Sequence, residues 1–237
     1  MSAKAAPDGT APDPAQRAIA TSLLADLPAS LRTRVLTGAL PVELPAGGTI
    51  YRDEEDPRCF LIVAGLVRIV LSAPDGRTLT IRYARAGELL GAPTIIGGPV
   101  PVSGELVTNT HLLVLNSRVL RHLGQTEPAV GWLLAREVTQ RLYDTIDALA
   151  DRAFSSLRQR VAHHLLDLAI AQPDGRLVAP VTQQQLAEAV GSARPAVAKV
   201  VAELRDLGLV TTAAPGIAIL NAEALHAETW SRPVSSG

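Results

Sequence analysis

The spacing of hydrophobic and polar residues changes twice along the chain. Residues 1–18 are rich in Ala, Pro and Asp and lack a continuous apolar run, so we expect an unstructured tail there. Residues 19–40 then carry apolar side chains at helical spacing. We expect two short helices in this segment, with Pro28 in the first turn of the second helix.

From residue 41 to about residue 115 the apolar runs become short, and Gly, Pro and Asp separate them. This pattern is typical of β-strands in a small barrel or jelly roll. The predicted strands are residues 49–51, 60–63, 66–71, 78–83, 104–108 and 112–115. The run Ala73-Pro74-Asp75-Gly76 predicts a tight turn between two of them, because proline fixes one φ and glycine accepts a positive φ.

From residue 128 the pattern is helical. Val138, Leu142, Thr145 and Leu149 follow steps of four, three and four residues, which predicts one apolar stripe on a long helix over residues 128–154. Such a helix is about 40 Å long. A small domain has too little core to bury the whole stripe, so we expect a helix from a second copy to cover it. Packing against the chain's own barrel is the alternative.

Two further helices are predicted near the carboxyl end, after a helix over residues 157–171 that Ser155 or Ser156 would cap. Thr182 and Gln185 have the spacing of a capping box, and Gly191 supplies a tight turn. Ser192 would cap the second helix, whose first turn tolerates Pro195. Residues 209–211 and 217–220 predict a two-stranded wing.

The faces of that second helix differ in character. Arg194 and Lys199 fall on its outer face, and the inward positions are apolar: Val197, Val200, Val201 and Leu204. Helix, glycine turn and helix make a helix-turn-helix, and a helix of this size fits the major groove of DNA. The same motif also occurs as simple packing, with the two cations as ordinary solvated charges.

Composition narrows the classes of protein. The chain has 237 residues, of which 47% are hydrophobic, and its 22 basic and 23 acidic residues nearly cancel. Wholesale disorder and a polycationic nucleic-acid coat are therefore excluded. The single cysteine, Cys59, excludes an internal disulfide and an iron–sulfur cluster, and we expect it to be a buried structural residue. The longest apolar stretch, residues 59–71, is too short to span a bilayer, so we expect a cytoplasmic protein without membrane contact.

Catalytic and metal sites are not expected. The chain has no glycine-rich phosphate loop and no nucleophile elbow, so we expect no enzyme activity. His111 and His122 are expected to be surface or strand-end residues rather than haem ligands. The adjacent His163 and His164 would point about 100° apart on a helix and make a poor metal pair, so no metal site is predicted.

Several stretches in this order resemble the family of bacterial transcription factors that includes the cyclic-AMP receptor protein and the fumarate–nitrate reduction regulator. The stretches are LPAGGTI at 44–50, FLIVAGLVR at 60–68, DGR at 75–77, AGELLG at 86–91 and TQQQLAEAVGSARP at 182–195. The resemblance covers residues 23–220 and implies an α+β fold: a cyclic-nucleotide-binding-like β-roll, a long dimerisation helix and a winged helix-turn-helix. The expected division is a tail (1–18), a sensory β-roll domain (19–127), the dimerisation helix (128–154) and the DNA-binding domain (155–237).

The resemblance also implies a function: a homodimer that binds double-stranded DNA and regulates transcription, with RNA polymerase as a partner if it activates. Arg194 would read a base edge, Lys199 would contact a phosphate or base, and Thr182 and Gln184 would hold the DNA backbone. The family often has glutamate directly after the arginine, whereas this chain has Pro195. We therefore expect an operator that differs from the family's familiar one.

The effector stays open. Family members that bind cyclic AMP have Gly-Glu-Leu and then an arginine that pairs with the cyclic phosphate, whereas this chain has Gly91-Ala92-Pro93 and then Val102-Ser103. A buried phosphate without a cationic partner is costly, so usual cyclic-AMP binding is not expected. Thr145 and Ile146 would close the same pocket. The alternatives are an unidentified small effector, another nucleotide bound elsewhere, or a constitutive dimer without ligand.

A second hypothesis is a β-roll sensor or scaffold whose helical module makes protein contacts only. Residues 155–237 contain seven basic and seven acidic side chains, and zero net charge favours this reading. It leaves the two outward cations unexplained.

Overall fold

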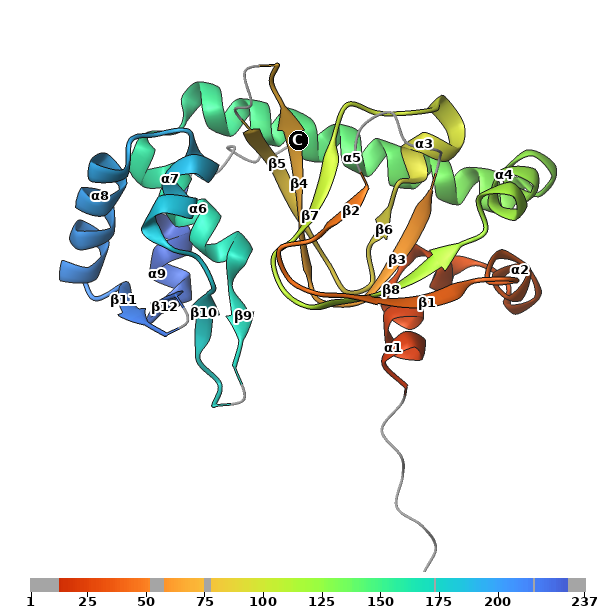
Figure 1. Ribbon diagram of the computed structural model, residues 1–237, viewed down its shortest axis with the longest axis horizontal. Helices are drawn as coiled ribbons and strands as arrows, with labels where there is room; N and C mark the ends of the chain where they lie inside the picture. The colour runs from red at the N-terminus through yellow and green to blue at the C-terminus, as the bar shows by residue number, and fades with distance from the viewer. Residues whose placement is uncertain (1–12, 52–57, 75–77, 173, 215, 230–237) are drawn as a thin grey trace, which may run out of the picture. The chain divides into compact units, whose positions relative to one another are not determined.

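The computed structural model describes residues 13–51, 58–74, 78–172, 174–214 and 216–229 (Figure 1). The chain forms two compact units. The first comprises Met1–Val67, Ala84–Val100 and Glu105–Thr139, and the second comprises Arg68–Tyr83, Pro101–Gly104 and Gln140–Gly237.

The first unit begins with helices α1 (Pro14–Thr21), η1 (Leu23–Asp26) and α2 (Ala29–Val35). The prediction of an unstructured tail up to residue 18 is therefore wrong for residues 14–18. The Asp13 side chain accepts a hydrogen bond from the Ala15 N–H at 3.1 Å and caps α1, and Ala18 is buried in the core. Pro28 is the N-cap residue of α2 rather than a residue of its first turn.

Two four-stranded sheets form the predicted β-roll. One has the order β1-β8-β3-β6 and is antiparallel throughout. Its strands are β1 (Leu40–Leu44), β3 (Cys59–Ala64), β6 (Leu89–Leu90) and β8 (Thr110–Leu115). The other has the order β2-β7-β4-β5. Its strands are β2 (Thr49–Tyr51), β4 (Leu66–Ser72), β5 (Thr78–Arg85) and β7 (Ser103–Leu106). The sequence analysis did not predict β1 and β6, and residues 75 and 76 of the predicted turn lie outside the described residues.

Two helices of the first unit were also not predicted: α3 (Ala92–Gly97) and α4 (Ser117–Thr126). The side chain of Asn116 caps α4 by accepting from the N–H groups of Arg118 and Val119. The core of this unit combines one face of a sheet with the surrounding helices. It contains Leu24, Val35, Cys59, Leu61, Leu115, Leu120, Leu123, Val130 and Leu133. A core drawn from strands and helices together explains why the short N-terminal helices are ordered.

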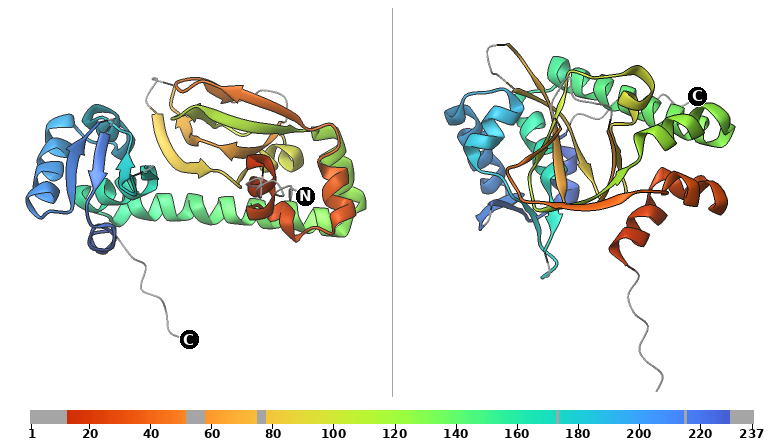
Figure 2. Two further views of the ribbon diagram at one scale, coloured as in Figure 1. Left: turned by 90° about the horizontal axis from the view of Figure 1, so that it is seen from below. Right: turned by 45° about the vertical axis from the view of Figure 1, so that its right-hand side comes forward.

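Helix α5 (Pro128–Phe154) is a single unbroken helix, as Figure 2 shows along its length. Its bounds agree with the predicted long helix over residues 128–154. Its buried residues are Val130, Leu133, Leu134 and Glu137, all in the first half.

The second unit contains the remaining elements. They are α6 (Leu157–Leu168), β9 (Ile170–Ala171), β10 (Leu177–Ala179), α7 (Gln183–Val190), α8 (Arg194–Asp206), β11 (Val210–Ala213), β12 (Gly216–Ile219) and α9 (Ala222–Ala227). Helix α6 is shorter than predicted because Ile170 and Ala171 pair with β10. The strands form a sheet of order β11-β12-β10-β9. Within the described ranges, no helix is long and apolar enough to cross a membrane.

Candidate nucleic-acid interface

Helix α7 begins and ends as the sequence indicates. The Thr182 Oγ1 accepts from the Gln185 N–H at 3.2 Å, and the Gln185 Oε1 accepts from the Thr182 N–H at 2.9 Å, which completes the capping box. At the other end Gly191 has φ +66°, and the Ser192 N–H donates to the Ala187 carbonyl at 3.0 Å. This is the Schellman arrangement, in which a residue of left-handed conformation closes a helix.

Helix α8 follows after a short turn. The prediction that Ser192 caps it is wrong: the N-cap residue is Ala193, which makes no side-chain cap bond. The closure of α7 extends through Ser192, whose N–H bonds the Ala187 carbonyl, and α8 begins one residue later than predicted. Pro195 lies in the first turn, as predicted, where its missing N–H costs little.

The two faces of α8 differ as predicted. Val197, Val200, Val201 and Leu204 are buried. Arg194, Pro195 and Lys199 are exposed. Within the described residues, neither cation has a hydrogen-bond or ion-pair partner, so both are available for an outside ligand. Burial of each large aliphatic side chain contributes about 1.5–3 kcal/mol, which fixes the face that α8 presents to solvent.

The two polar candidates of α7 already have partners. The Thr182 hydroxyl donates to the Gln185 Oε1 at 3.0 Å, and the Gln184 Nε2 donates to the Glu188 Oε1 at 2.8 Å. Both side chains are exposed. A phosphate at this position would have to share or replace these bonds.

Helix α6 supports the α7–α8 pair within the second unit (Figure 1). Ser156 begins α6 with a full capping box, in which its side chain bonds Gln159. The Arg158 guanidinium donates twice to Glu228, at 2.8 and 3.0 Å, and so ties α6 to the chain after α9. The wing is formed by β11 and β12, with Val210 opposite Ile219.

The six residues predicted for the effector pocket fall on both units. In the first unit, Gly91 has φ +84° and Ala92 is fully buried. In the second unit Val102 and Ser103 are partly buried, the Thr145 hydroxyl donates to the Arg141 carbonyl at 2.8 Å, and Ile146 is exposed. Their grouping into one pocket stays a prediction.

The predicted dimer stripe on α5 is exposed over most of its length. Leu142 and Leu149 are 55% and 68% exposed, and Thr145 is also exposed. Val138 is partly buried. Tyr143 and Phe154, which the sequence analysis did not include, are exposed apolar residues of the same helix.

Comparison with known proteins decides the family. Residues 41–127 match the model of the cyclic nucleotide-binding domain, and residues 159–228 match that of the Crp-like helix-turn-helix domain. The CRP-like cAMP-activated global transcriptional regulator of Mycobacterium tuberculosis is 30% identical over 192 residues, which cover 78% of this chain and 86% of that protein. Transcriptional regulator LdrP of Thermus thermophilus is 32% identical over 189 residues, covering 77% of this chain and 93% of LdrP. The chain belongs to the CRP/FNR family of transcriptional regulators.

A solved structure agrees with this assignment. A CRP/FNR-family transcriptional regulator of Thermus thermophilus has a TM-score of 0.67 and 28% identity, covering 81% of this chain and all of that chain. The protein is therefore a transcription regulator with a DNA-binding helix-turn-helix domain. Its relatives are regulators rather than enzymes.

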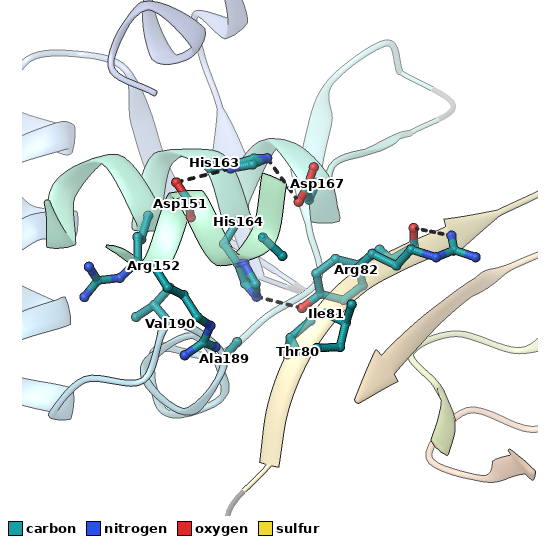
Figure 3. Close-up of a pocket in the computed structure, with 13 residues that line it drawn as sticks. Thr80, Ile81, Arg82, Asp151, Arg152, His163, His164, Asp167, Ala189 and Val190 are labelled. Carbon is teal, nitrogen blue, oxygen red and sulfur yellow. Dashed lines mark hydrogen bonds and ion pairs between the residues drawn. The ribbon is translucent and has the colours of Figure 1, made fainter. Parts of the chain in front are cut away.

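The regulator also has a polar pocket that the sequence analysis missed. It lies within the second unit and is a hollow of about 450 Å³, its open mouth included. Figure 3 shows His163 between Asp151 and Asp167, while the neighbouring His164 points to the other side. The His164 Nε2 is 3.1 Å from the Tyr83 Oη, and the two rings meet edge to face. Adjacent histidines on a helix thus meet different partners, as their spacing predicts.

Their surroundings shift the pKa values of the two histidines in opposite directions. Burial, with help from the nearby positive charges of His163 and Arg68, lowers the pKa of His164 to about 3, so this ring is neutral. The contact with the Asp151 carboxylate raises the pKa of His163, burial opposes this, and the charge of Asp167 adds to it.

Cys59 is buried, as predicted. Burial and then the nearby charge of Glu137 raise the pKa of its thiol to about 12, so it stays protonated. In the described part of the chain, no group of three or more His, Cys, Asp or Glu side chains could hold a metal ion.

Proposed function

We propose that the regulator acts as a homodimer that reads a two-part operator, with one α8 helix in the major groove of each half-site. The observation that supports this most directly is the contrast between the two faces of α8. Four aliphatic side chains on one face are buried in the second unit. Arg194 and Lys199 are exposed on the other face and have no partner among the described residues. Arginine donates two hydrogen bonds to guanine O6 and N7, the most frequent specific contact in the major groove.

A second copy along α5 is supported by the exposed apolar residues there. Leu142, Tyr143, Ile146, Leu149 and Phe154 lie within four turns of one helix and are all at least 40% exposed. A second α5 would remove this surface from water in the manner of a coiled coil. In a parallel pair, each copy would present one α8 helix to DNA. A duplex can accept two such helices at half-sites about 34 Å apart.

The roles of individual side chains follow from their chemistry. Arg194 reads a base edge, Lys199 contacts a phosphate or a base, and Thr182, Gln184 and Ser192 contact the DNA backbone. Pro195 lacks the carboxylate that would accept from cytosine N4. Because of this substitution, the operator departs from the sequence that relatives with glutamate at the same position would select.

The effector of this regulator is not cyclic AMP bound in the usual way. Ala92 and Val102 offer neither a carboxylate for a ribose hydroxyl nor a guanidinium for a phosphate, and Ala92 is fully buried. An unidentified small effector or a constitutive dimer remains. RNA polymerase is the further partner if the protein activates transcription.

The test is selection of bound sequences from random DNA with the full chain, its Arg194→Ala variant and an Arg205→Ala control. Arg205 is an exposed arginine in the last turn of the same helix. We expect Arg194→Ala to relax preference at one base pair of each half-site and to cost about 1–3 kcal/mol per contact. The control should keep the full preference. An unchanged preference in Arg194→Ala, or no binding to any duplex at low salt, would contradict the proposal.

A further inference from the structure

The link between α5 and α6 is short and closely bonded. Helix α5 ends at Phe154 and α6 begins at Leu157, so only Ser155 and Ser156 separate them. The buried Ser155 donates through its hydroxyl to the Asp151 Oδ1 at 2.5 Å, and its carbonyl accepts from the Arg160 Nη1 at 2.7 Å. We call this segment, residues 151–163, the α5–α6 joint.

One ion pair crosses the joint. The His163 Nδ1 is 3.7 Å from the Asp151 Oδ1 on α5, and the His163 Nε2 is 3.6 Å from the Asp167 Oδ2 on α6 itself (Figure 3). The contact with Asp167 stays when α6 moves, because both residues belong to one helix. The contact with Asp151 is lost if α6 swings away from the end of α5.

The charged groups around His163 are mixed in sign. From α5 come Asp147, Asp151 and Arg152, and from α6 come Arg160, Asp167 and the neutral His164. Strand β5 adds Arg82, which is 3.8 Å from Asp144, and Tyr83 at His164. Helix α7 contributes only the uncharged Ala189 and Val190. Three carboxylates therefore face the imidazole, and the two nearest bracket its two nitrogens.

We propose that protonation of His163 closes the α5–α6 joint, so that the regulator senses pH through the orientation of α6 relative to α5. Helix α6 packs against α7 and α8, so a change in the orientation of α6 moves the helix-turn-helix relative to the last turns of α5. Closure of the α5–α6 joint by protonation does not depend on DNA. Only its consequence for operator binding rests on the proposed function.

The direction follows from linkage. The ion-pair contact with Asp151 raises the pKa of His163 above its ordinary 6.5 when the joint is closed. The contribution of His163 to closure is thus fully present below pH 6.5 and is lost as pH rises through the raised pKa. Burial opposes ionisation of Asp151, but the contact with His163, the hydrogen bond from Ser155 and the positive charges of His163 and Arg160 lower its pKa, so this partner stays ionised.

The test measures amide hydrogen exchange over the joint in the full chain, at about pH 6 and about pH 8.5, after correction for intrinsic exchange. We expect the opening constant of the joint to rise about two- to fivefold between these values, the size of a half-exposed ion pair. His163→Gln removes the charge and should abolish the rise. Asp151→Asn should abolish it too, although its Oδ1 still accepts from Ser155.

A matched control separates the two carboxylates. Asp167→Asn removes the partner on the same helix but keeps the cross-joint pair, so the rise should persist with its midpoint at lower pH. A ring titration of His163 by NMR should show a lower midpoint in Asp151→Asn than in the wild type. An unchanging opening constant in the wild type, or an equal rise in His163→Gln, would overturn the inference.

The effect on DNA binding is measured in a separate experiment. If the protein binds an operator, the wild type should change affinity over the same pH range and His163→Gln should not. Loss of all DNA binding would refute the proposed function and leave the exchange result standing. A pH-dependent joint with pH-independent operator affinity would refute its regulatory consequence.

Discussion

Truncation of the exposed α5 stripe should dissociate the regulator without unfolding it. The perturbation is the double variant Leu142→Ala and Leu149→Ala. In the single chain these side chains are 55% and 68% exposed, so neither holds the fold together. Their apolar surface is buried only if a second copy covers it.

The magnitude follows from that exposed surface. Complete burial of one leucine side chain stabilises by about 1.5–3 kcal/mol, and a dimer interface could bury at most the exposed share of each. Two leucines in each of two copies, less the methyl group that alanine keeps, give about 3–5 kcal/mol for the dimer. The dissociation constant should therefore rise about a hundredfold to several thousandfold. The unfolding free energy of the separated chain should change by no more than about 0.5 kcal/mol per site, as at other surface positions.

Sedimentation equilibrium across a concentration series measures this, with urea unfolding of each variant in parallel. The control is Leu207→Ala with Leu220→Ala, since these leucines are 58% and 59% exposed but lie outside α5. The control should sediment as the wild type does. A wild type that is monomeric at micromolar concentration, or a stripe variant as dimeric as the wild type, would refute the reasoning.

Three further outcomes are expected. Leu204→Ala opens a cavity at a fully buried position of α8 and should lower the unfolding free energy by about 2–5 kcal/mol in urea titration. An unchanged unfolding free energy would show that Leu204 is not part of the core. The wild type should lose stability as pH falls below 6.5 toward 3, because burial lowers the pKa of His164 to about 3 and the unfolded chain takes the proton first. His164→Gln should lose less over that range, and an equal loss would contradict this. Lys199→Gln should weaken binding to all sequences alike and reduce the salt slope by about one, as measured by titration of labelled duplexes; a change in base preference would instead make it a base contact.

The strongly periodic helices were predictable, and the physical reason is local. Helix α5 was predicted with its bounds because its apolar stripe repeats over several turns. Helix α7 was predicted because Thr182, Gln185 and Gly191 each make a contact within the helix or its end. The start of α8 was missed because its N-cap residue, Ala193, has no side-chain acceptor, so a rule that looks for a capping side chain selects Ser192 instead.

Contacts between distant segments were not predictable in the same way. Tyr83 and His164 are 81 residues apart, and no spacing rule joins them. The polar pocket around His163 was missed for this reason, although the opposite orientation of the two histidines followed from helical geometry. By contrast, α4 was predictable: Asn116 stands in the N-cap position before apolar residues at helical spacing, and the sequence analysis overlooked that signal.

The glycine at the strand end separates evidence for the fold from evidence for the ligand. A Cβ atom on Gly91 would lie 1.9 Å from the Arg58 carbonyl oxygen, and the backbone there has φ +84°, so glycine is required by the packing of the chain alone. The next residue, Ala92, is fully buried, and a carboxylate there would need a partner to offset its desolvation. The packing of this chain thus needs the glycine whatever ligand it binds, whereas the packing does not call for a carboxylate at the next position. The absence of a carboxylate at position 92 therefore says more about the effector than the presence of the glycine.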